Sequence, residues 1–200
     1  MPVGCRVLRV GGRIAARGAP GSRLGQTGRV TSDEDVLSVC FVCSGNICRS
    51  PIAEKVYLTV LEREGLADRV RVSSAGTGPW HAGEPADARA ADVLRRNGYP
   101  SDHVARQVNP NHLDADLLLA ASAEHLGALT RELGGRDAAE RVRLVRSFDP
   151  AAPAGAELPD PYYGGDHGFD EVLEMVEAAM PGLLEWTRSQ LENRRAEATP

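Results

Sequence analysis

Cysteine is absent from most of the chain, and this absence argues against a disulfide-stabilised secreted fold. The four cysteines, Cys5, Cys40, Cys43 and Cys48, all lie in the first quarter of the 200 residues. A disulfide framework would spread its cysteines along the chain. Three cysteines within nine residues instead favour thiol chemistry or a metal site in a reducing compartment.

The chain also lacks a long apolar run and a broad basic surface. No stretch of about 18 apolar residues exists, so we expect no membrane-spanning segment. Residues 1–30 carry six arginines and no acid, which leaves 17 of the 23 basic residues to share the remainder with all 28 acidic ones. Such an acidic body is a poor match for nucleic acid or an anionic membrane surface. An anion would have to bind at one concentrated local site.

The first 35 residues differ in composition from the rest. They are rich in arginine and glycine, and arginines interrupt every apolar run, so a secretory signal is not expected. Glycine-rich disorder is the favoured interpretation, while a transit peptide and a misassigned start codon stay open. We therefore expect a disordered extension over residues 1–35, one domain over 36–193 and a flexible tail over 194–200. The expected location is the cytoplasm, with signal-less export left open.

Alternating strand and helix patterns follow residue 35. Short apolar runs predict strands and amphipathic or capped segments predict helices. The strands are expected at residues 36–42, 70–74, 116–121 and 142–147, and the helices at 50–64, 86–97, 123–133 and 169–191. This order predicts a single α/β domain, a four-stranded parallel sheet with helices on both faces. Ligands bind such sheets at the carboxyl ends of the strands, so the loop after the first strand is the expected phosphate-binding loop.

That loop, from Cys43 to Ser50, reads Cys-Ser-Gly-Asn-Ile-Cys-Arg-Ser. The backbone N–H groups of a tight loop that enters a helix converge on one spot and bind anions there. Arg49 adds a planar fork whose paired donors match two phosphate oxygens. The same positive field favours the thiolate form of Cys43, which is the nucleophilic form. The loop therefore predicts a phosphate site with a cysteine nucleophile.

The other loop residues are compatible with this cradle. Gly45 lets the backbone approach an oxyanion, and Asn46 tolerates a left-handed conformation. Ser50 is predicted to cap the next helix, and its hydroxyl can also donate to Cys43 when the thiolate leaves. The alternative is an inert buried Cys43 beside a surface Arg49, which this combination of residue types disfavours.

The segment Val42–Glu54 resembles the signature of the low-molecular-weight protein tyrosine phosphatases, in particular the secreted-type actinobacterial members. The resemblance spans residues 37–191 and includes Ser73–Thr77, Trp80-His81, His103–Gln107 and Asp160–Tyr163. It implies hydrolysis of phosphotyrosine through a phospho-cysteine intermediate. Its implied catalytic residues are Cys43 as nucleophile, Arg49 as phosphate clamp and Asp160 as general acid and base. The residues implied in phosphate or substrate binding are Ser44, Gly45, Asn46, Ile47, Cys48, Ser50, Trp80, Tyr162 and Tyr163.

The acid and the aromatic residues depend on this resemblance. By itself, Asp160-Pro161 is typical of a turn. The resemblance assigns Asp160 the proton donation that expels a phenolate, followed by activation of water. Trp80, Tyr162 and Tyr163 are expected to form a slot too deep for phosphoserine, with ordinary packing as the alternative for Trp80. The two tyrosines are also candidate targets of a tyrosine kinase.

Two further positions concern the support of the loop. Ser74 and His103 match family positions that hydrogen-bond to the asparagine of the loop, here Asn46. The family usually carries an aspartate after the third strand, whereas this chain has Ser122. We expect this loss of charge to have a modest effect on stability or rate.

Four other functions compete with this interpretation. Cys40 and Cys43 form a C-x-x-C, but a structural zinc site needs four ligands and no second pair has suitable spacing. Arsenate reductases of this fold use cysteines well downstream of the nucleophile, and none follows Cys48. Protein arginine phosphatases have threonine where Ile47 stands and lack the paired tyrosines. A non-catalytic phosphopeptide-binding module would lack the nucleophile or the acid.

The remaining expectations concern regulation and partners. Oxidation could join Cys48 to Cys43 reversibly, with a packing role for Cys48 as the alternative. No metal or organic cofactor is expected, because a thiolate, an arginine and a carboxylate suffice. The expected partner is a phosphotyrosine protein, and a monomer is the expected state.

Overall fold

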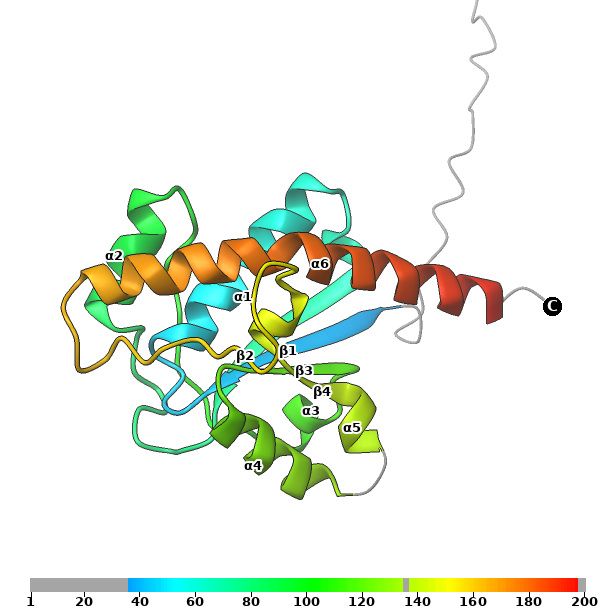
Figure 1. Cartoon of the computed structure of the whole chain (residues 1–200), viewed down its shortest axis with the longest axis horizontal. Helices are drawn as coiled ribbons and strands as arrows, with labels where there is room; N and C mark the ends of the chain where they lie inside the picture. The colour runs from blue at the N-terminus through cyan, green and yellow to red at the C-terminus, as the bar shows by residue number, and fades with distance from the viewer. Residues whose placement is uncertain (1–35, 135–136, 198–200) are drawn as a thin grey trace, which may run out of the picture. The chain divides into compact units, whose positions relative to one another are not determined.

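Four parallel strands form the centre of the structure, a computed structural model that describes residues 36–134 and 137–197. Their order in the sheet is β2-β1-β3-β4 (Figure 1). The strands are β1 (Leu37–Cys43), β2 (Val70–Gly76), β3 (Leu117–Ala120) and β4 (Val142–Leu144). This sheet confirms the predicted fold class. Residues 1–35, for which we expected disorder, lie outside the described ranges.

Helices of very different lengths connect and cover the strands. The α-helices are α1 (Arg49–Arg63), α2 (Ala88–Arg96), α3 (Pro110–Leu113), α4 (Ala123–Leu133), α5 (Asp137–Arg141) and α6 (His167–Glu197). Two 3₁₀ turns, η2 (Ala67–Arg69) and η3 (Val145–Phe148), complete the elements. No helix among the described residues is both long enough and apolar enough to cross a bilayer.

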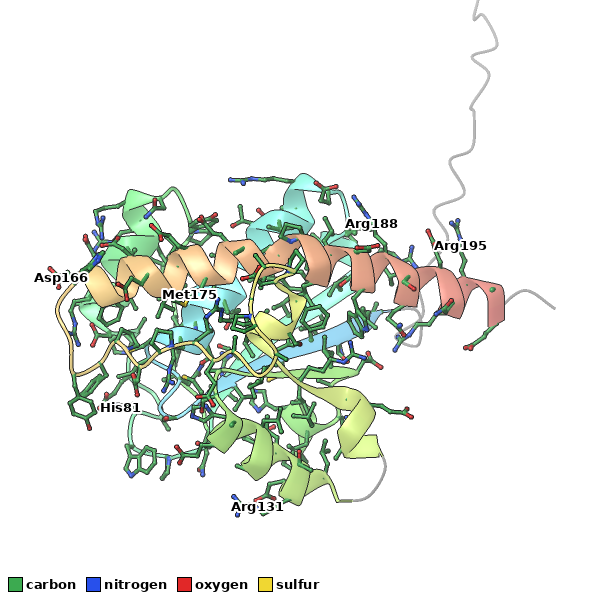
Figure 2. All side chains as sticks on the ribbon, viewed as in Figure 1. His81, Arg131, Asp166, Met175, Arg188 and Arg195 are labelled. Carbon is green, nitrogen blue, oxygen red and sulfur yellow. The ribbon has the colours of Figure 1, made fainter. Side chains whose placement is uncertain are left out.

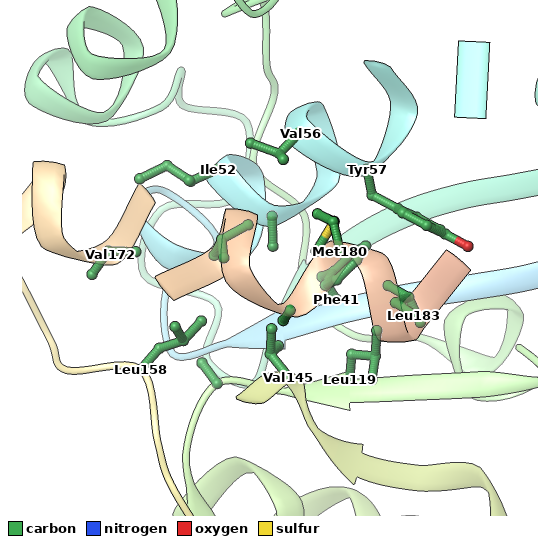
Figure 3. Close-up of a cluster of buried hydrophobic side chains, with 14 of the residues drawn as sticks. Phe41, Ile52, Val56, Tyr57, Leu119, Val145, Leu158, Val172, Met180 and Leu183 are labelled. Carbon is green, nitrogen blue, oxygen red and sulfur yellow. The ribbon is translucent and has the colours of Figure 1, made fainter. Parts of the chain in front are cut away.

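The sheet is buried on both faces, as the continuous apolar runs predicted. Odd-numbered residues of β1, such as Phe41, pack with α1, α2 and α6, whereas Cys40 and Val42 pack with α4 and α5. Figure 1 shows the same two layers of helices, with α1, α2 and α6 on one side of the sheet and α4 and α5 on the other. Figure 3 shows side chains of α1 and α6 meeting Phe41 and Leu119 in the larger cluster.

The structure corrects three boundaries. The strand predicted over residues 142–147 is wrong in its second half, because the chain turns into η3 at Val145. Helix α1 begins at Arg49 with Cys48 as its N-cap residue and no side-chain cap, so the predicted capping by Ser50 is wrong. Helix α6 runs from His167 to Glu197, so the helix predicted over residues 169–191 extends beyond the predicted bounds at both ends. Near the end of this helix, Arg194 donates to the carbonyl oxygen of Val36 at 3.1 Å and also to Asp116.

Helix α6 approaches η3 at one glycine. A Cβ atom on Gly182 would lie 2.2 Å from the carbonyl oxygen of Phe148, which is well inside van der Waals contact. The absence of a side chain at Gly182 therefore sets how closely this helix packs over the core.

Candidate active site

The phosphate-binding loop begins where β1 ends. Cys43 is the last residue of β1 and pairs with Gly76 at the end of β2. Its side chain is buried, and its Sγ lies 3.0 Å from the hydroxyl of Ser50 in the first turn of α1. The loop therefore runs directly into a helix N-terminus, where backbone N–H groups and the helix dipole favour negative charge. This arrangement suits a thiolate and an anionic ligand.

Asn46 holds the middle of the loop together. It has the left-handed backbone conformation expected from sequence, with φ of 57°. Its side-chain amide donates to the hydroxyls of Ser50 at 2.9 Å and Ser74 at 2.8 Å. Its side-chain oxygen accepts from the backbone N–H of Arg106 at 2.8 Å. The loop is thereby fastened to α1, to β2 and to the segment before α3.

A second layer of polar residues supports Asn46. His103 Nε2 donates to the backbone carbonyl of Asn46 at 2.8 Å, and burial lowers the pKa of His103. Ser74 in turn donates to the carboxylate of Glu54 on α1. Both contacts to Asn46 that were expected of Ser74 and His103 are present. Glu54, which the sequence analysis did not single out, completes this support.

Gly76 allows β2 to pass close behind the loop. A Cβ atom at this position would lie 2.7 Å from the carbonyl oxygen of Ser44 and 3.0 Å from the carbonyl carbon of Gly45. Real Cβ atoms do not approach backbone this closely, so any other residue would push the loop away from the strand. The loop shape therefore depends on a glycine that lies outside the loop.

Arg49 lies beneath the loop with most of its donors engaged. One terminal nitrogen, Nη2, donates to Asp160 Oδ2 at 2.9 Å and to the hydroxyl of Ser44 at 3.3 Å. The other, Nη1, donates to the carbonyl of Leu158 at 3.4 Å. Its buried Nε has no hydrogen-bond acceptor among the described residues. A buried unpaired donor is costly, so an anion bound at the loop would satisfy it.

Ser44 connects Arg49 to a buried histidine. The Ser44 hydroxyl lies 2.9 Å from His125 Nε2, and His125 Nδ1 lies 2.7 Å from the hydroxyl of Ser122. Burial, and then the charge of Arg49, lowers the pKa of His125 to about 4, so its ring is neutral at pH 7. Because Ser44 accepts from Arg49, its own proton points to Nε2, which places the ring proton on Nδ1 facing Ser122. The donors therefore run in one direction from Arg49 to Ser122.

The site opens into a pocket of about 360 Å³. Its lining includes the three residues expected to be catalytic, Cys43, Arg49 and Asp160. The other lining residues are Ser44, Gly45, Ile47, Cys48, Trp80, His81, Tyr162 and Tyr163. Asn46 and Ser50 do not line the pocket, because their side chains are buried behind the loop.

Aromatic side chains stand around the mouth of this pocket. Trp80 and Tyr163 are 70% and 92% exposed, which is unusual for large rings and leaves them available to a ligand. His81, labelled in Figure 2, adds a ring that sequence analysis did not assign to the site. Its centroid lies 6.4 Å from that of Tyr162, and its Nδ1 lies 2.6 Å from Glu84. An imidazole therefore lies among the rings that line the pocket.

The cysteines next to Cys43 have separate environments. Cys40 packs on the opposite face of the sheet, and burial raises its pKa to about 12. Burial, followed by the charge of Asp87, raises the pKa of Cys48 to about 12 as well. No group of three or more metal-ligating side chains is placed to hold an ion in the described part of the chain. Cys40 and Cys43 therefore lie on opposite faces of the sheet, which is not the geometry of a dithiol.

Comparison with known proteins gives one consistent family. The profile of the family described as "Low molecular weight phosphotyrosine protein phosphatase" matches residues 38–196. The chain is 53% identical to "Low molecular weight protein-tyrosine phosphatase A" of Mycobacterium tuberculosis, over 78% of this chain and 95% of that protein. It is 52% identical to "Low molecular weight protein-tyrosine-phosphatase" of Streptomyces coelicolor, over 79% and 98% respectively. A solved protein tyrosine phosphatase from Entamoeba histolytica superimposes with a TM-score of 0.71 and 30% identity, over 77% of this chain and 98% of that one.

Proposed function

Because the chain belongs to the low molecular weight phosphotyrosine protein phosphatase family, we propose that it hydrolyses phosphotyrosine in proteins through a phospho-cysteine intermediate. One observation carries the proposal. A buried thiol at a helix N-terminus, a buried guanidinium and a carboxylate line the same pocket, contributed by Cys43, Arg49 and Asp160. These three groups supply a nucleophile, an oxyanion clamp and a proton carrier.

In the first step the thiolate of Cys43 attacks phosphorus. The S–P bond forms as the P–O bond to the phenol breaks, and Asp160 donates its proton to the departing oxygen. Arg49 and the loop N–H groups hold the other phosphate oxygens, where negative charge is concentrated. The 2.9 Å contact between Arg49 and Asp160 places the carboxyl group beside the phosphate clamp, within reach of a leaving group bound there.

In the second step water releases the phosphate. Asp160, now a carboxylate, takes a proton from a water molecule whose oxygen attacks phosphorus, and the S–P bond breaks to regenerate the thiolate. The Ser50 hydroxyl, 3.0 Å from Cys43 Sγ, is placed to donate to the sulfur as its charge returns. Asn46 fixes this hydroxyl, since its amide donates to the Ser50 oxygen.

The pocket favours a phosphate carried on an aromatic ring. A phosphate on a shorter side chain, as in phosphoserine, or on a planar basic group, as in phosphoarginine, fits it less well. Cys43 is only 2% exposed, so a phosphate must be carried to it on a long side chain. Tyr162, Tyr163 and Trp80 offer ring faces and edges of the kind that stack on a phenyl group. Ile47, also in the lining, presents an apolar wall where an arginine phosphatase would be expected to carry threonine. These features favour phosphotyrosine.

The test uses matched peptides that bear phosphotyrosine, phosphoserine or phosphoarginine. Wild-type protein should turn over phosphotyrosine, Cys43→Ser should abolish turnover, and Asp160→Asn should lower the rate by about 10²–10⁴. A preference for phosphoarginine would move the substrate assignment to the related activity. Absence of turnover by folded wild-type protein, or full activity of Asp160→Asn, would contradict the proposed mechanism.

The proposal extends to partners and location. Phosphotyrosine proteins are the substrates, and the exposed hydroxyl-bearing ring of Tyr163 is open to a tyrosine kinase, as Tyr162 is to a lesser extent. A phosphate on either ring would stand at the pocket mouth and repel an anionic substrate. The proposed location is the cytoplasm, because a reducing compartment keeps Cys43 reduced. The proposed state is a monomer, and the activity requires neither nucleic acid nor a membrane.

A further inference from the structure

We propose that Arg89, on the first turn of α2, is a positioning residue that holds the loop carrying Asp160 over the phosphate-binding loop. This inference rests on the proposed function, because it assigns Arg89 an effect on the proton transfer by Asp160. The segment concerned is residues 160–164, called here the acid loop. Arg89 does not line the pocket, so it would act only through the residues that it holds.

Arg89 donates hydrogen bonds to two backbone carbonyl groups of the acid loop. Its Nη1 donates to the carbonyl of Gly164 at 2.9 Å, and its Nη2 donates to the carbonyl of Tyr162 at 3.0 Å. Its guanidinium carbon also lies 6.0 Å from the centroid of the Tyr162 ring and 4.6 Å from that of Phe169 at the start of α6. Hydrogen bonds from a charged fork combined with ring stacking define an orientation that a single contact would not.

The other side of Arg89 is fixed by Asp87. Arg89 Nε donates to Asp87 Oδ1 at 3.0 Å and Nη2 to Oδ2 at 2.8 Å, which is a bidentate pair. This pairing is the first cause of the lowered pKa of Asp87, so the carboxylate stays ionised. Asp87 also caps α2, since its Oδ1 accepts from the backbone N–H of Arg89 at 2.9 Å. The guanidinium is therefore anchored to the start of a helix.

The same anchor reaches the phosphate-binding loop. The backbone N–H of Asp87 donates to the carbonyl of Ile47 at 2.9 Å. Asp87 and Arg89 thus hold both loops, one through Ile47 and the other through Tyr162 and Gly164. Because Cys43 and Asp160 lie on these two loops, the start of α2 sets their relative position.

Tyr162 connects Arg89 directly to Asp160. The backbone N–H of Tyr162 donates to Asp160 Oδ1 at 3.2 Å, while the carbonyl of Tyr162 is held by Arg89. Among the described residues, the charged partner of Asp160 is Arg49, at 2.9 Å. A phosphate group that engages Arg49 competes for that bond. During the reaction Arg89 would then be the main charged restraint on the acid loop.

The experiment compares two substrates that differ in how much they need an acid. Phenyl phosphate releases a basic phenolate and requires protonation, whereas 4-nitrophenyl phosphate releases a weakly basic one. For Arg89→Ala, kcat/KM on phenyl phosphate should fall about tenfold more than kcat/KM on 4-nitrophenyl phosphate. Competitive inhibition by inorganic phosphate, which has no leaving group to protonate, should change less than threefold. A general loss of structure would not produce this selectivity.

Arg96→Ala is the matched control, because Arg96 lies on the same helix and carries two carboxylate contacts. It pairs with Asp92 and Asp170, each at 2.9 Å, and does not contact the acid loop. Its leaving-group dependence should match that of the wild type. Arg89→Lys keeps the charge but not the bidentate fork, so it should fall between the wild type and Arg89→Ala. In an Asp160→Asn background, Arg89→Ala should cause no further change in leaving-group dependence.

Three results would overturn the inference while leaving the proposed function intact. The first is an equal loss of kcat/KM on both substrates for Arg89→Ala. The second is the same selective loss on phenyl phosphate for Arg96→Ala. The third is a further change in leaving-group dependence when Arg89→Ala is added to Asp160→Asn. If Arg89→Ala does not fold, Arg89→Lys must show the selective loss on phenyl phosphate, and wild-type selectivity there would overturn the inference. A wild-type protein without turnover would instead contradict the proposed function itself.

Discussion

His125 should make the protein less stable in mildly acidic solution. Its ring is buried, and burial followed by the positive charge of Arg49 lowers its pKa to about 4. The carboxylates of Glu124, Asp160 and Glu157 oppose this shift but do not cancel it. In the unfolded chain the same histidine titrates near its ordinary value of about 6.5. At a pH between these two pKa values, His125 is protonated in the unfolded state and neutral in the folded state.

The sign and size of the effect follow from this difference. The stabilisation from a neutral His125 is fully present above about pH 6.5 and is lost as the pH falls toward about 4. The whole window corresponds to roughly 3 kcal/mol, since one pKa unit is about 1.4 kcal/mol. Between pH 7 and pH 5, a single group of this kind lowers the free energy of unfolding by about 2 kcal/mol. Below about pH 4 this group causes no further loss.

The assay is urea unfolding of wild type and His125→Gln at pH 7 and at pH 5. The variant should be less stable at pH 7, because it weakens the contacts to Ser44 and Ser122, yet it should lose about 2 kcal/mol less on acidification. Other histidines, including His103, titrate in both proteins and cancel in the comparison. Equal losses in wild type and His125→Gln would refute the reasoning.

Two further predictions concern packing and oxidation. Gly182→Ala should lower the free energy of unfolding by about 1–3 kcal/mol, because its Cβ would meet the Phe148 carbonyl at 2.2 Å. Gly127→Ala in α4, which meets nothing within 4 Å, should be neutral or stabilising, and equal effects would contradict the packing argument. After peroxide treatment, thiol reductant should restore activity in wild type but not in Cys48→Ser, if a Cys43–Cys48 disulfide shields the nucleophile. Equal recovery in both would exclude that disulfide, whose formation should accelerate with pH because the pKa of Cys48 is raised.

The strands and longer helices could be predicted because each has a local hydrophobic pattern. The helix predicted over residues 123–133 matches α4 at both ends, and Gly134 ends it with φ of 63°. Helix α3 was missed because its four residues are shorter than any periodic window, although Asn109 and His112 form a capping box at its start. The second half of the predicted fourth strand failed because apolar residues such as Val145 serve a 3₁₀ turn as well as a strand.

The residues of the candidate site also differ in whether the sequence could predict them. The loop residues were predictable because cradle, nucleophile and clamp are adjacent in sequence, and Asp160 was identified through resemblance. Arg89 and Glu54 gave no signal, because their partners lie on other elements and only the fold brings them together. One signal was available for His125. It follows Ser122 by three residues at the start of a predicted helix, a spacing that places the two side chains on one face.

Ser122 is the uncharged last member of the hydrogen-bonded series that starts at Arg49. The family usually carries an aspartate at this position. A carboxylate at this position would favour a protonated His125, whereas a serine hydroxyl accepts from the neutral ring at 2.7 Å. The neutral ring in turn leaves the Ser44 hydroxyl free to accept from Arg49. Among the described residues, Asp160 is then the carboxylate that contacts Arg49, and it is also the group that changes protonation during the proposed reaction. The charge of Arg49 is therefore balanced by Asp160 and by an incoming phosphate, and not by a carboxylate at position 122.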